Sequence, residues 1–382
     1  PDCLINMKTI PYGRQWIDED DIQAVVEALK SDWLTQGPKI DEFEKALARY
    51  CGSKYAVVVS NGTAALHLAC LAAGITDGDE VITSPITFAA SANCAVYCGA
   101  RAVFADIDKD TYNINPSEIA GKITSKTKAI IPVHFAGLPC GMEEIGEIAQ
   151  KHGLIVIEDA CHALGAEYRV KESWVRVGSC RHSDMAVLSF HPVKQITTGE
   201  GGAILTNSQQ LYEKLTLLRT HGITKNAQRF VNKNEAFSSN GGVLTANPWY
   251  YEMQELGFNY RLTDIQCALG LSQLNKLDKF VAKRRAIATT YSEAFKEIEY
   301  VKTPLEPKGR KSACHLYVLQ IDFERIGKNR AVVMTELTKV GVGTQVHYIP
   351  VYTQPFYKKM GFKEDCFPEA EKYYKKALSI PM

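Results

Sequence analysis

The chain has 382 residues, of which 46% are hydrophobic and 23% are charged, a composition typical of a globular protein with a large buried core. Its 44 basic and 43 acidic residues nearly cancel, and the net charge of +1 gives no electrostatic indication of binding to nucleic acid or an anionic membrane. No signal peptide and no apolar run of transmembrane length occur, so we expect a cytoplasmic protein. We expect residues 1–6, which precede Met7, to be a remnant added before the natural start.

The cysteines and histidines show no pattern of a disulfide framework or a metal site. There are 11 cysteines, an odd number, and no two of them form a C-x-x-C pair. Several lie in apolar helix or strand contexts, namely Cys70, Cys94, Cys98 and Cys267. We expect reduced, buried thiols in preference to disulfides, and no bound metal.

The first elements in chain order are two predicted helices. Residues 18–29 begin with acidic side chains, which suit the positive end of a helix dipole, and residues 39–50 form a second helix that stops at Gly52. Strands and helices then alternate. The seven candidate strands are continuous apolar runs and cover residues 56–59, 81–83, 102–106, 129–133, 155–157, 185–190 and 202–206.

Helical patterns lie between the first five strands, at residues 63–73, 88–98, 116–123 and 142–152, whereas the connection from the fifth strand to the sixth is irregular. Continuous apolar strands are typical of a sheet that is covered on both faces. The pattern therefore predicts a three-layer α/β/α domain with a mostly parallel seven-stranded sheet.

The remaining chain predicts a smaller α+β domain. A helix at residues 209–219 is followed by a polar stretch, residues 226–248, which is expected to be a mobile loop. The later candidate elements are helices at 263–277, 277–295 and 330–339 and a strand within 314–321. We expect a large domain over residues 1–262 and a small C-terminal domain, with its connecting helix, over residues 263–382.

Lys194 is the most informative single residue, because it lies in a short turn-rich segment between two apolar strands. Pro192 stiffens the approach, and Gly199, Gly201 and Gly202 allow the backbone to come close to another group. A lysine presented from the end of a buried sheet suits Schiff-base chemistry, since partial desolvation lowers its pKa. The alternative interpretation is an ordinary solvated lysine.

The segment 57–66 reads as a strand, a small polar turn and a helix start. Backbone N–H groups at that helix N-terminus, with Gly62 and the hydroxyl of Thr63, predict a phosphate site. The alternative is that Ser60 or Asn61 simply caps the helix.

Asp159 and Phe88 follow two other strands of the predicted sheet. A carboxylate at the end of a buried strand needs a partner, and a protonated pyridine nitrogen would be one. A helix cap or an internal salt bridge is the alternative for Asp159. Phe88 could stack on a flat cofactor ring or be an ordinary core residue.

Four motifs carry a resemblance to a known family: residues 60–66, 158–163, 189–202 and 257–266. The sequence resembles the DegT-type sugar-nucleotide aminotransferases, within the aspartate-aminotransferase fold (fold type I), from Ile10 to Met382. Such relatives usually continue for another helix, so we expect further chain after Met382. Dehydratase relatives carry histidine in place of Lys194, and the lysine therefore favours transamination.

The resemblance implies pyridoxal 5′-phosphate as the cofactor and assigns roles to residues. Lys194 would form the Schiff base and Asp159 would pair with the pyridine nitrogen, as the two catalytic residues. Phe88 would stack on the ring, His162 would lie near the ring hydroxyl, and the phosphate would be bound by Thr63, Ala64 and Ser189. Asn259 would reach the phosphate of a neighbouring subunit, which implies a homodimer with shared active sites.

The implied activity is a ping-pong transfer of an amino group, with glutamate as the expected donor, to a nucleotide sugar. Segments 84–88 and 247–254 favour the 4-keto position of a UDP-linked 4-keto-6-deoxy-N-acetylhexosamine, as in pseudaminic acid biosynthesis. The alternatives are a 3-keto nucleotide-sugar aminotransferase and a non-catalytic regulator that binds pyridoxal phosphate. Candidate sugar-binding residues are Tyr12, Thr35, His347 and Tyr348.

Overall fold

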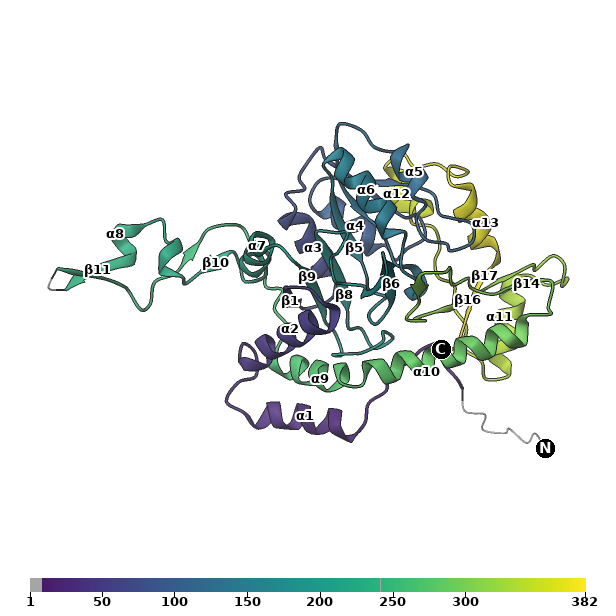
Figure 1. Ribbon diagram of the computed structural model, residues 1–382, viewed down its shortest axis with the longest axis horizontal. Helices are drawn as coiled ribbons and strands as arrows, with labels where there is room; N and C mark the ends of the chain where they lie inside the picture. The colour runs from purple at the N-terminus through teal and green to yellow at the C-terminus, as the bar shows by residue number, and fades with distance from the viewer. Residues whose placement is uncertain (1–8, 241) are drawn as a thin grey trace.

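A seven-stranded sheet forms the centre of the computed structural model, which describes residues 9–240 and 242–382 (Figure 1). Its spatial order is β1 (Tyr55–Val59), β9 (Gly202–Thr206), β8 (Met185–Ser189), β5 (Ile155–Asp159), β4 (Thr127–Ile131), β2 (Glu80–Thr83) and β3 (Arg101–Phe104). β9 runs antiparallel to β1 and β8, whereas every other neighbouring pair is parallel. The predicted mostly parallel sheet is confirmed, and residues 1–8 of the predicted large domain lie outside the described residues.

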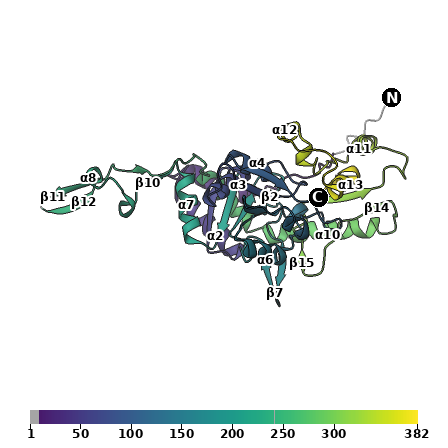
Figure 2. The same ribbon diagram turned by 90° about the horizontal axis from the view of Figure 1, so that it is seen from above.

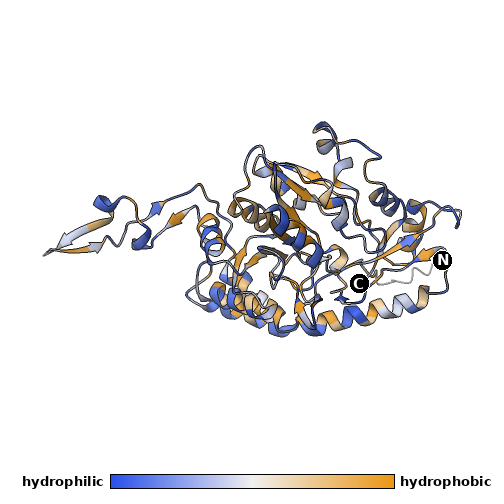
Figure 3. Ribbon diagram, turned by 45° about the horizontal axis from the view of Figure 1, so that its top comes forward, coloured by the Kyte–Doolittle hydropathy of each residue, from blue (hydrophilic) through white to orange (hydrophobic). Residues whose placement is uncertain are grey.

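Helices cover both faces of this sheet. Successive strand residues point to opposite sides, and both sets are apolar, so each face needs a covering layer. Val58 faces a core that includes α2 (Pro38–Cys51), α6 (Met142–His152) and α9 (Asp264–Leu274). Val57 faces a second core formed with α3 (Gly62–Ala72), α4 (Ala90–Tyr97) and α7 (Gln209–Arg219). Figure 3 shows apolar colours along the central strands. The predicted three-layer α/β/α arrangement is therefore confirmed.

Two further helices belong to the large α/β/α part of the chain. α1 (Glu19–Lys30) begins with an Asp18 capping box and packs on α9, while the short α5 (Pro116–Ala120) follows β3. The connection predicted to be irregular contains an antiparallel hairpin, β6 (Glu167–Val170) and β7 (Ser173–Arg176), to which β15 (Arg310–Lys311) adds a third strand. No helix in the described part of the chain is long and apolar enough to cross a membrane.

The polar stretch at residues 226–248 projects from the body as an arm, as two views show (Figures 1 and 2). It contains a short helix, α8 (Lys233–Ala236), and an antiparallel hairpin of β11 (Phe237–Asn240) and β12 (Val243–Ala246). A second short ladder, β10 (Ile223–Thr224) with β13 (Glu252–Met253), joins its base. The prediction of a loop was wrong, because cross-strand backbone pairing forms a hairpin in a sequence that lacks an apolar pattern.

The C-terminal part is built around a second sheet of β14 (Val301–Lys302), β16 (Tyr317–Ile321) and β17 (Ala377–Ile380). The long α10 (Leu277–Phe295) leads to it, and α11 (Arg330–Lys339) packs on its own apolar cluster. The remaining elements are α12 (Pro355–Lys359) and α13 (Pro368–Lys376). Phe104 of β3 lies in one core with Tyr352 and Phe367, so C-terminal residues also pack against the large sheet.

Candidate active site

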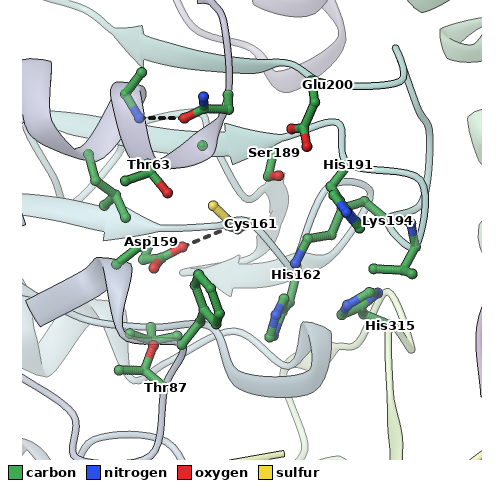
Figure 4. A pocket seen from close by; sticks show the side chains of 18 of the residues that line it. Thr63, Thr87, Asp159, Cys161, His162, Ser189, His191, Lys194, Glu200 and His315 are labelled. Carbon is green, nitrogen blue, oxygen red and sulfur yellow. Dashed lines mark hydrogen bonds between the residues drawn. The ribbon is translucent and has the colours of Figure 1, made fainter. Parts of the chain in front are cut away.

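A cavity of about 730 Å³ lies at the carboxyl ends of the central strands (Figure 4). Asp159 ends β5, Ser189 ends β8, and Asn61 follows β1, so three parallel strands deliver polar side chains to one edge of the sheet. Ligands of open α/β sheets bind at this edge. The predicted site residues that line the cavity are Tyr12, Thr63, Ala64, Phe88, Asp159, His162, Ser189, Lys194, His347 and Tyr348.

Two predicted residues, Thr35 and Asn259, are not part of this cavity lining. Both are exposed to solvent. Asn259 forms an isolated antiparallel bridge with Thr220, next to the arm, and Thr35 lies in the bend that precedes α2. Within one copy of the chain, Thr35 and Asn259 therefore do not line the cavity with the other ten predicted site residues.

The N-terminus of α3 forms one wall of the cavity. The side-chain oxygen of Asn61 accepts a hydrogen bond from the backbone N–H of Ala64 at 2.8 Å, so the capping interpretation holds for Asn61. A Cβ on Gly62 would lie 3.0 Å from Cβ of Ser189, and a Cβ on Gly202 would lie 2.6 Å from the carbonyl carbon of Asn61. Both glycines allow the helix start to approach the strand ends, where its positive dipole end faces the cavity.

Asp159 is a buried carboxylate that accepts hydrogen bonds and, among the described residues, forms no direct ion pair. Ser91 donates its hydroxyl to Oδ2 at 2.6 Å, and the backbone N–H of Cys161 donates to Oδ1 at 3.2 Å. Among the described residues, no lysine, arginine or histidine forms an ion pair with Asp159. Because burying an unpaired charge is costly, the site favours a positively charged partner at this position. The salt-bridge alternative for Asp159 is thereby excluded within the described chain.

Lys194 extends its side chain into the cavity, toward His162 (Figure 4). Its backbone N–H donates to the carbonyl of His191 at 2.8 Å, which forms the turn after β8. Burial lowers the pKa of the Lys194 amine, while the nearby Cys161 and Asp159 act in the opposite direction. A lysine of this kind is more easily deprotonated than a solvated one and can act as a nucleophile or a base.

Three histidines around the amine are held neutral. Burial, followed by the charge of Lys194, lowers the pKa of His162 well below its usual value, and burial lowers that of His347 to about 4. His315, whose ring centroid lies 4.4 Å from that of His162, has its pKa lowered chiefly by burial. The imidazoles therefore surround Lys194 without adding positive charge.

The sequence did not reveal every residue of the cavity. His315 comes from the loop before β16, and no motif near it indicated a site. Further lining residues without an assigned role in the sequence are Thr87, His67, Tyr97, His191, Glu200 and Tyr260. Only the three-dimensional fold brings these side chains to the strand ends.

Pyridoxal 5′-phosphate fits these residues by three independent criteria. A phosphate dianion needs backbone donors, which the start of α3 can provide. A protonated pyridine nitrogen needs a carboxylate that forms no direct ion pair with another group, which describes Asp159 among the described residues. An aldehyde needs a nucleophilic amine, which describes Lys194. The buried Nδ1 atoms of His162 and His315 also lack hydrogen-bond partners within the described residues.

Comparison with known proteins agrees with this reading of the cavity. The DegT/DnrJ/EryC1/StrS aminotransferase family matches residues 15–382. The chain is 43% identical to the spore coat polysaccharide biosynthesis protein SpsC of Bacillus subtilis, covering 98% of this chain and 92% of the relative. It is 41% identical to a UDP-4-amino-4,6-dideoxy-N-acetyl-beta-L-altrosamine transaminase of Campylobacter jejuni, covering 97% and 92% of the two chains.

A solved structure has the same fold over nearly the whole chain. It is the Helicobacter pylori aminotransferase PseC, described as involved in the biosynthesis of pseudoaminic acid, with a TM-score of 0.86 and 35% identity. The alignment covers 98% of this chain and 94% of PseC. Sugar aminotransferases of this kind use pyridoxal 5′-phosphate. The protein belongs to the DegT/DnrJ/EryC1/StrS aminotransferase family and is a pyridoxal-phosphate-dependent sugar aminotransferase.

Proposed function

We propose that the enzyme moves an amino group from glutamate to the 4-keto position of a UDP-linked 4-keto-6-deoxy-N-acetylhexosamine by a ping-pong mechanism. The Campylobacter jejuni relative, whose name gives a UDP-linked 4-amino-4,6-dideoxy sugar, supports this substrate. PseC supports a place in pseudaminic acid biosynthesis. The observation that carries the mechanism is that one cavity contains both Asp159, a buried carboxylate without a direct ion pair, and Lys194, a lysine of lowered pKa.

Lys194 acts in this proposal as both nucleophile and proton carrier. Its Nζ would hold the cofactor through the aldehyde carbon, for which a nucleophilic amine is needed. The same Nζ would act as general base and acid toward the substrate carbon, a role that needs an amine that is unprotonated near neutral pH. Burial of Lys194 favours that state.

The other cofactor-binding residues would position the cofactor and stabilise the charge on its ring. When bound, the cofactor supplies a conjugated ring that accepts the electron pair released at the substrate carbon. Asp159 holds the proton on the ring nitrogen, and Ser91 fixes its carboxylate by donating to Oδ2. Thr63, Ala64 and Ser189 bind the phosphate at the start of α3. Phe88 covers the ring; its own ring lies 6.3 Å from that of Tyr348.

The sugar would bind where the N-terminal segment meets the C-terminal domain. The rings of Tyr12 and His347 lie 5.4 Å apart, and Tyr348 follows directly in the chain. Ile10 bridges Val342, so the N-terminal segment is tied to the C-terminal elements. These three side chains offer aromatic faces and polar groups suited to a nucleotide sugar. Thr35 can take part only if it is supplied by a second copy.

A homodimer with shared sites would explain the surface near the arm. Large apolar side chains are exposed there, including Leu244 at 71% and Trp249 at 73%. Contiguous exposed apolar residues of this kind mark interaction surfaces. We propose that two copies pair so that Asn259 of each donates to the cofactor phosphate of the other. The ten cysteines of the described chain are free thiols, which suits the reducing cytoplasm as the place of reaction.

A substrate panel tests the proposal directly. Purified holoenzyme would be incubated with glutamate and with UDP-linked 4-keto and 3-keto sugars, and amino-sugar products would be measured by mass spectrometry. We expect the 4-keto sugar to be aminated and the colour of the bound cofactor to bleach with glutamate alone, as the first half of a ping-pong cycle requires. Preferential amination of a 3-keto sugar would replace the proposed substrate. A cofactor colour that no amino donor changes would indicate a binding protein instead of an enzyme.

A further inference from the structure

Two hydroxyl groups follow one another behind the carboxylate of Asp159. The Ser91 hydroxyl, in the first turn of α4, lies 2.6 Å from Oδ2 of Asp159. The Thr87 hydroxyl lies 2.6 Å from that of Ser91. Both side chains are buried, with exposed fractions of 2% for Thr87 and 0% for Ser91. The amino-transfer chemistry proposed above uses Ser91 and Asp159 but gives Thr87 no role.

The direction of these two hydrogen bonds follows from the charge of the carboxylate. An ionised carboxylate has no proton and can only accept, so the single proton of the Ser91 hydroxyl belongs to the 2.6 Å contact with Asp159. The carbonyl of Phe88 competes weakly for that proton, because it is neutral and lies 3.3 Å from the Ser91 oxygen. Since Ser91 has no second proton, Thr87 is the donor in the contact between the two hydroxyls.

The start of α4 directs both hydroxyls toward the end of β5. The N-cap of α4 is Ala89, which provides no side-chain cap, and the Ser91 hydroxyl reaches Asp159 instead of the backbone N–H groups of its own helix. Within residues 9–240 and 242–382, the Thr87 hydroxyl forms a hydrogen bond with Ser91 alone. A buried donor is costly to leave unpaired, so this bond restrains the Ser91 hydroxyl in the orientation that reaches the carboxylate.

We propose that Thr87 is a positioning residue for the cofactor and acts on its ring nitrogen through Ser91 and Asp159. Donation from Thr87 polarises the Ser91 hydroxyl and strengthens its bond to the carboxylate, because consecutive hydrogen bonds in a buried chain reinforce one another. A carboxylate stabilised in this way keeps the proton on the ring nitrogen. The inference rests on the proposed pairing of Asp159 with that nitrogen.

Three substitutions isolate the hydroxyl of Thr87 from its size and its burial. Thr87→Val removes the donor and keeps a branched side chain of similar volume, whereas Thr87→Ser keeps the donor. Thr83→Val is the matched control, because Thr83 is also buried and donates its hydroxyl to the carbonyl of Ile131 at 2.8 Å. Thr83 does not line the cavity, so its variant reports the effect of losing a buried threonine hydroxyl elsewhere.

Binding of two ligands to the full chain, freed of cofactor, separates this role from general damage to the fold. One ligand is pyridoxamine 5′-phosphate, which needs no covalent bond to Lys194, and the other is the same molecule with C–H in place of the ring nitrogen. The ratio of their dissociation constants measures the preference for the nitrogen. We expect Thr87→Val to lower this preference roughly two- to fivefold, and Thr87→Ser and Thr83→Val to retain it. An equal loss of affinity for both ligands in Thr87→Val would overturn the proposal.

A double variant tests whether Thr87 acts through Ser91. If it does, Thr87→Val should change the preference in the wild type but cause no further loss in Ser91→Ala, because residues of one hydrogen-bond chain are not additive. Additive losses would overturn the relay while leaving the pairing of Asp159 intact. In contrast, Asp159→Asn with the preference of the wild type would refute that pairing, and the role of Thr87 would fall with it.

The half-reaction of the holoenzyme with glutamate provides a second readout. A residue that acts on the ring nitrogen alone changes the rate of the chemical step and leaves binding of the amino donor unchanged. We therefore expect Thr87→Val to lower the rate at saturating glutamate roughly two- to fivefold, with the same half-saturating concentration of glutamate. Thr87→Ser should restore the rate. A higher half-saturating concentration with an unchanged maximal rate would place Thr87 in donor binding and overturn the proposal.

Discussion

The hydroxyl of Tyr348 lies 3.1 Å from Nε2 of His162, which joins the C-terminal part of the chain to the loop after β5. Burial raises the pKa of the Tyr348 hydroxyl and lowers that of His162, so the tyrosine keeps its proton and the imidazole is neutral. Either group can be the donor, because a phenol both donates and accepts and a neutral imidazole carries its proton on one of its two nitrogens. This contact therefore ties the C-terminal part of the chain to the His162 ring without adding charge to the cavity.

Removing that hydroxyl should weaken the site without unfolding the protein. In Tyr348→Phe the ring remains, but Nε2 of His162 loses its hydrogen-bond partner, a change worth about 0.5–1.5 kcal/mol. We expect kcat/KM for the sugar to fall by roughly two- to tenfold, with the melting temperature lowered by no more than a few degrees. Steady-state kinetics with varied sugar check this, and Tyr300→Phe, on the surface, is the matched control. Equal kinetics for Tyr348→Phe and the wild type would contradict the role.

Lys194→Ala should abolish amino transfer while the fold is retained. The other lysines of the described chain do not line the cavity, so no second amine can replace its nucleophile and proton carrier. We expect the turnover rate to fall by several orders of magnitude. Circular dichroism would confirm the fold, and Lys151→Ala, at an exposed position of α6, should retain full activity. Turnover near the wild-type rate in Lys194→Ala would refute the assignment.

Asp159→Asn should bind the cofactor but react slowly. The amide can keep a hydrogen bond from Ser91, yet it carries no charge to hold a proton on the ring nitrogen. The rate of the single half-reaction with glutamate, followed by the cofactor absorbance, should fall at least tenfold. Ser91→Ala removes only the supporting hydrogen bond and should have a smaller effect. A half-reaction of normal speed in Asp159→Asn would make Asp159 a purely structural residue.

His347 should make the stability of the protein depend on pH. Burial lowers its pKa from 6.5 to about 4 in the folded state, while one ring nitrogen lies 2.9 Å from the Ser379 hydroxyl. The unfolded chain therefore binds the proton first, and stability is lost as pH falls from about 6.5 to 4. The shift corresponds to about 3 kcal/mol. His347→Asn should remove this part of the pH dependence, measured by urea unfolding at pH 7 and pH 4.5. An unchanged difference between the two pH values would contradict it.

The sequence predicts elements well where local apolar pattern and tertiary fold agree. Residues 202–206 are a continuous apolar run and form β9 over the same residues, because the central sheet is covered on both faces. β11 and β12 were not predicted, because their strands have no apolar face and contain the polar residues Ser238, Ser239 and Thr245. β17 was missed because its strand character comes from pairing with the distant β16.

The residues of the candidate site likewise divide into those that the local sequence indicates and those that only the tertiary fold brings together. Asp159, Ser189 and Lys194 could be placed from sequence because each is next to a predicted strand end. His315 and Tyr97 could not, since nothing in their neighbours along the chain indicates a cavity, and only packing between α3, α4 and the C-terminal loops brings them there. Asn259 and Thr35 illustrate a third case, in which one copy of the chain leaves a predicted residue exposed.

Mixing two inactive variants tests whether Asn259 completes the active site of a second copy. In a two-fold dimer each contact occurs twice, so each composite site would contain Lys194 from one copy and Asn259 from the other. If Asn259→Ala alone is inactive, its heterodimer with Lys194→Ala has one site without either group and one intact site. Half of the dimers are heterodimers after free exchange, so activity should recover to about a quarter of the wild-type value. Native mass spectrometry would verify exchange. Verified heterodimers without activity would place Asn259 within its own subunit and refute the shared site.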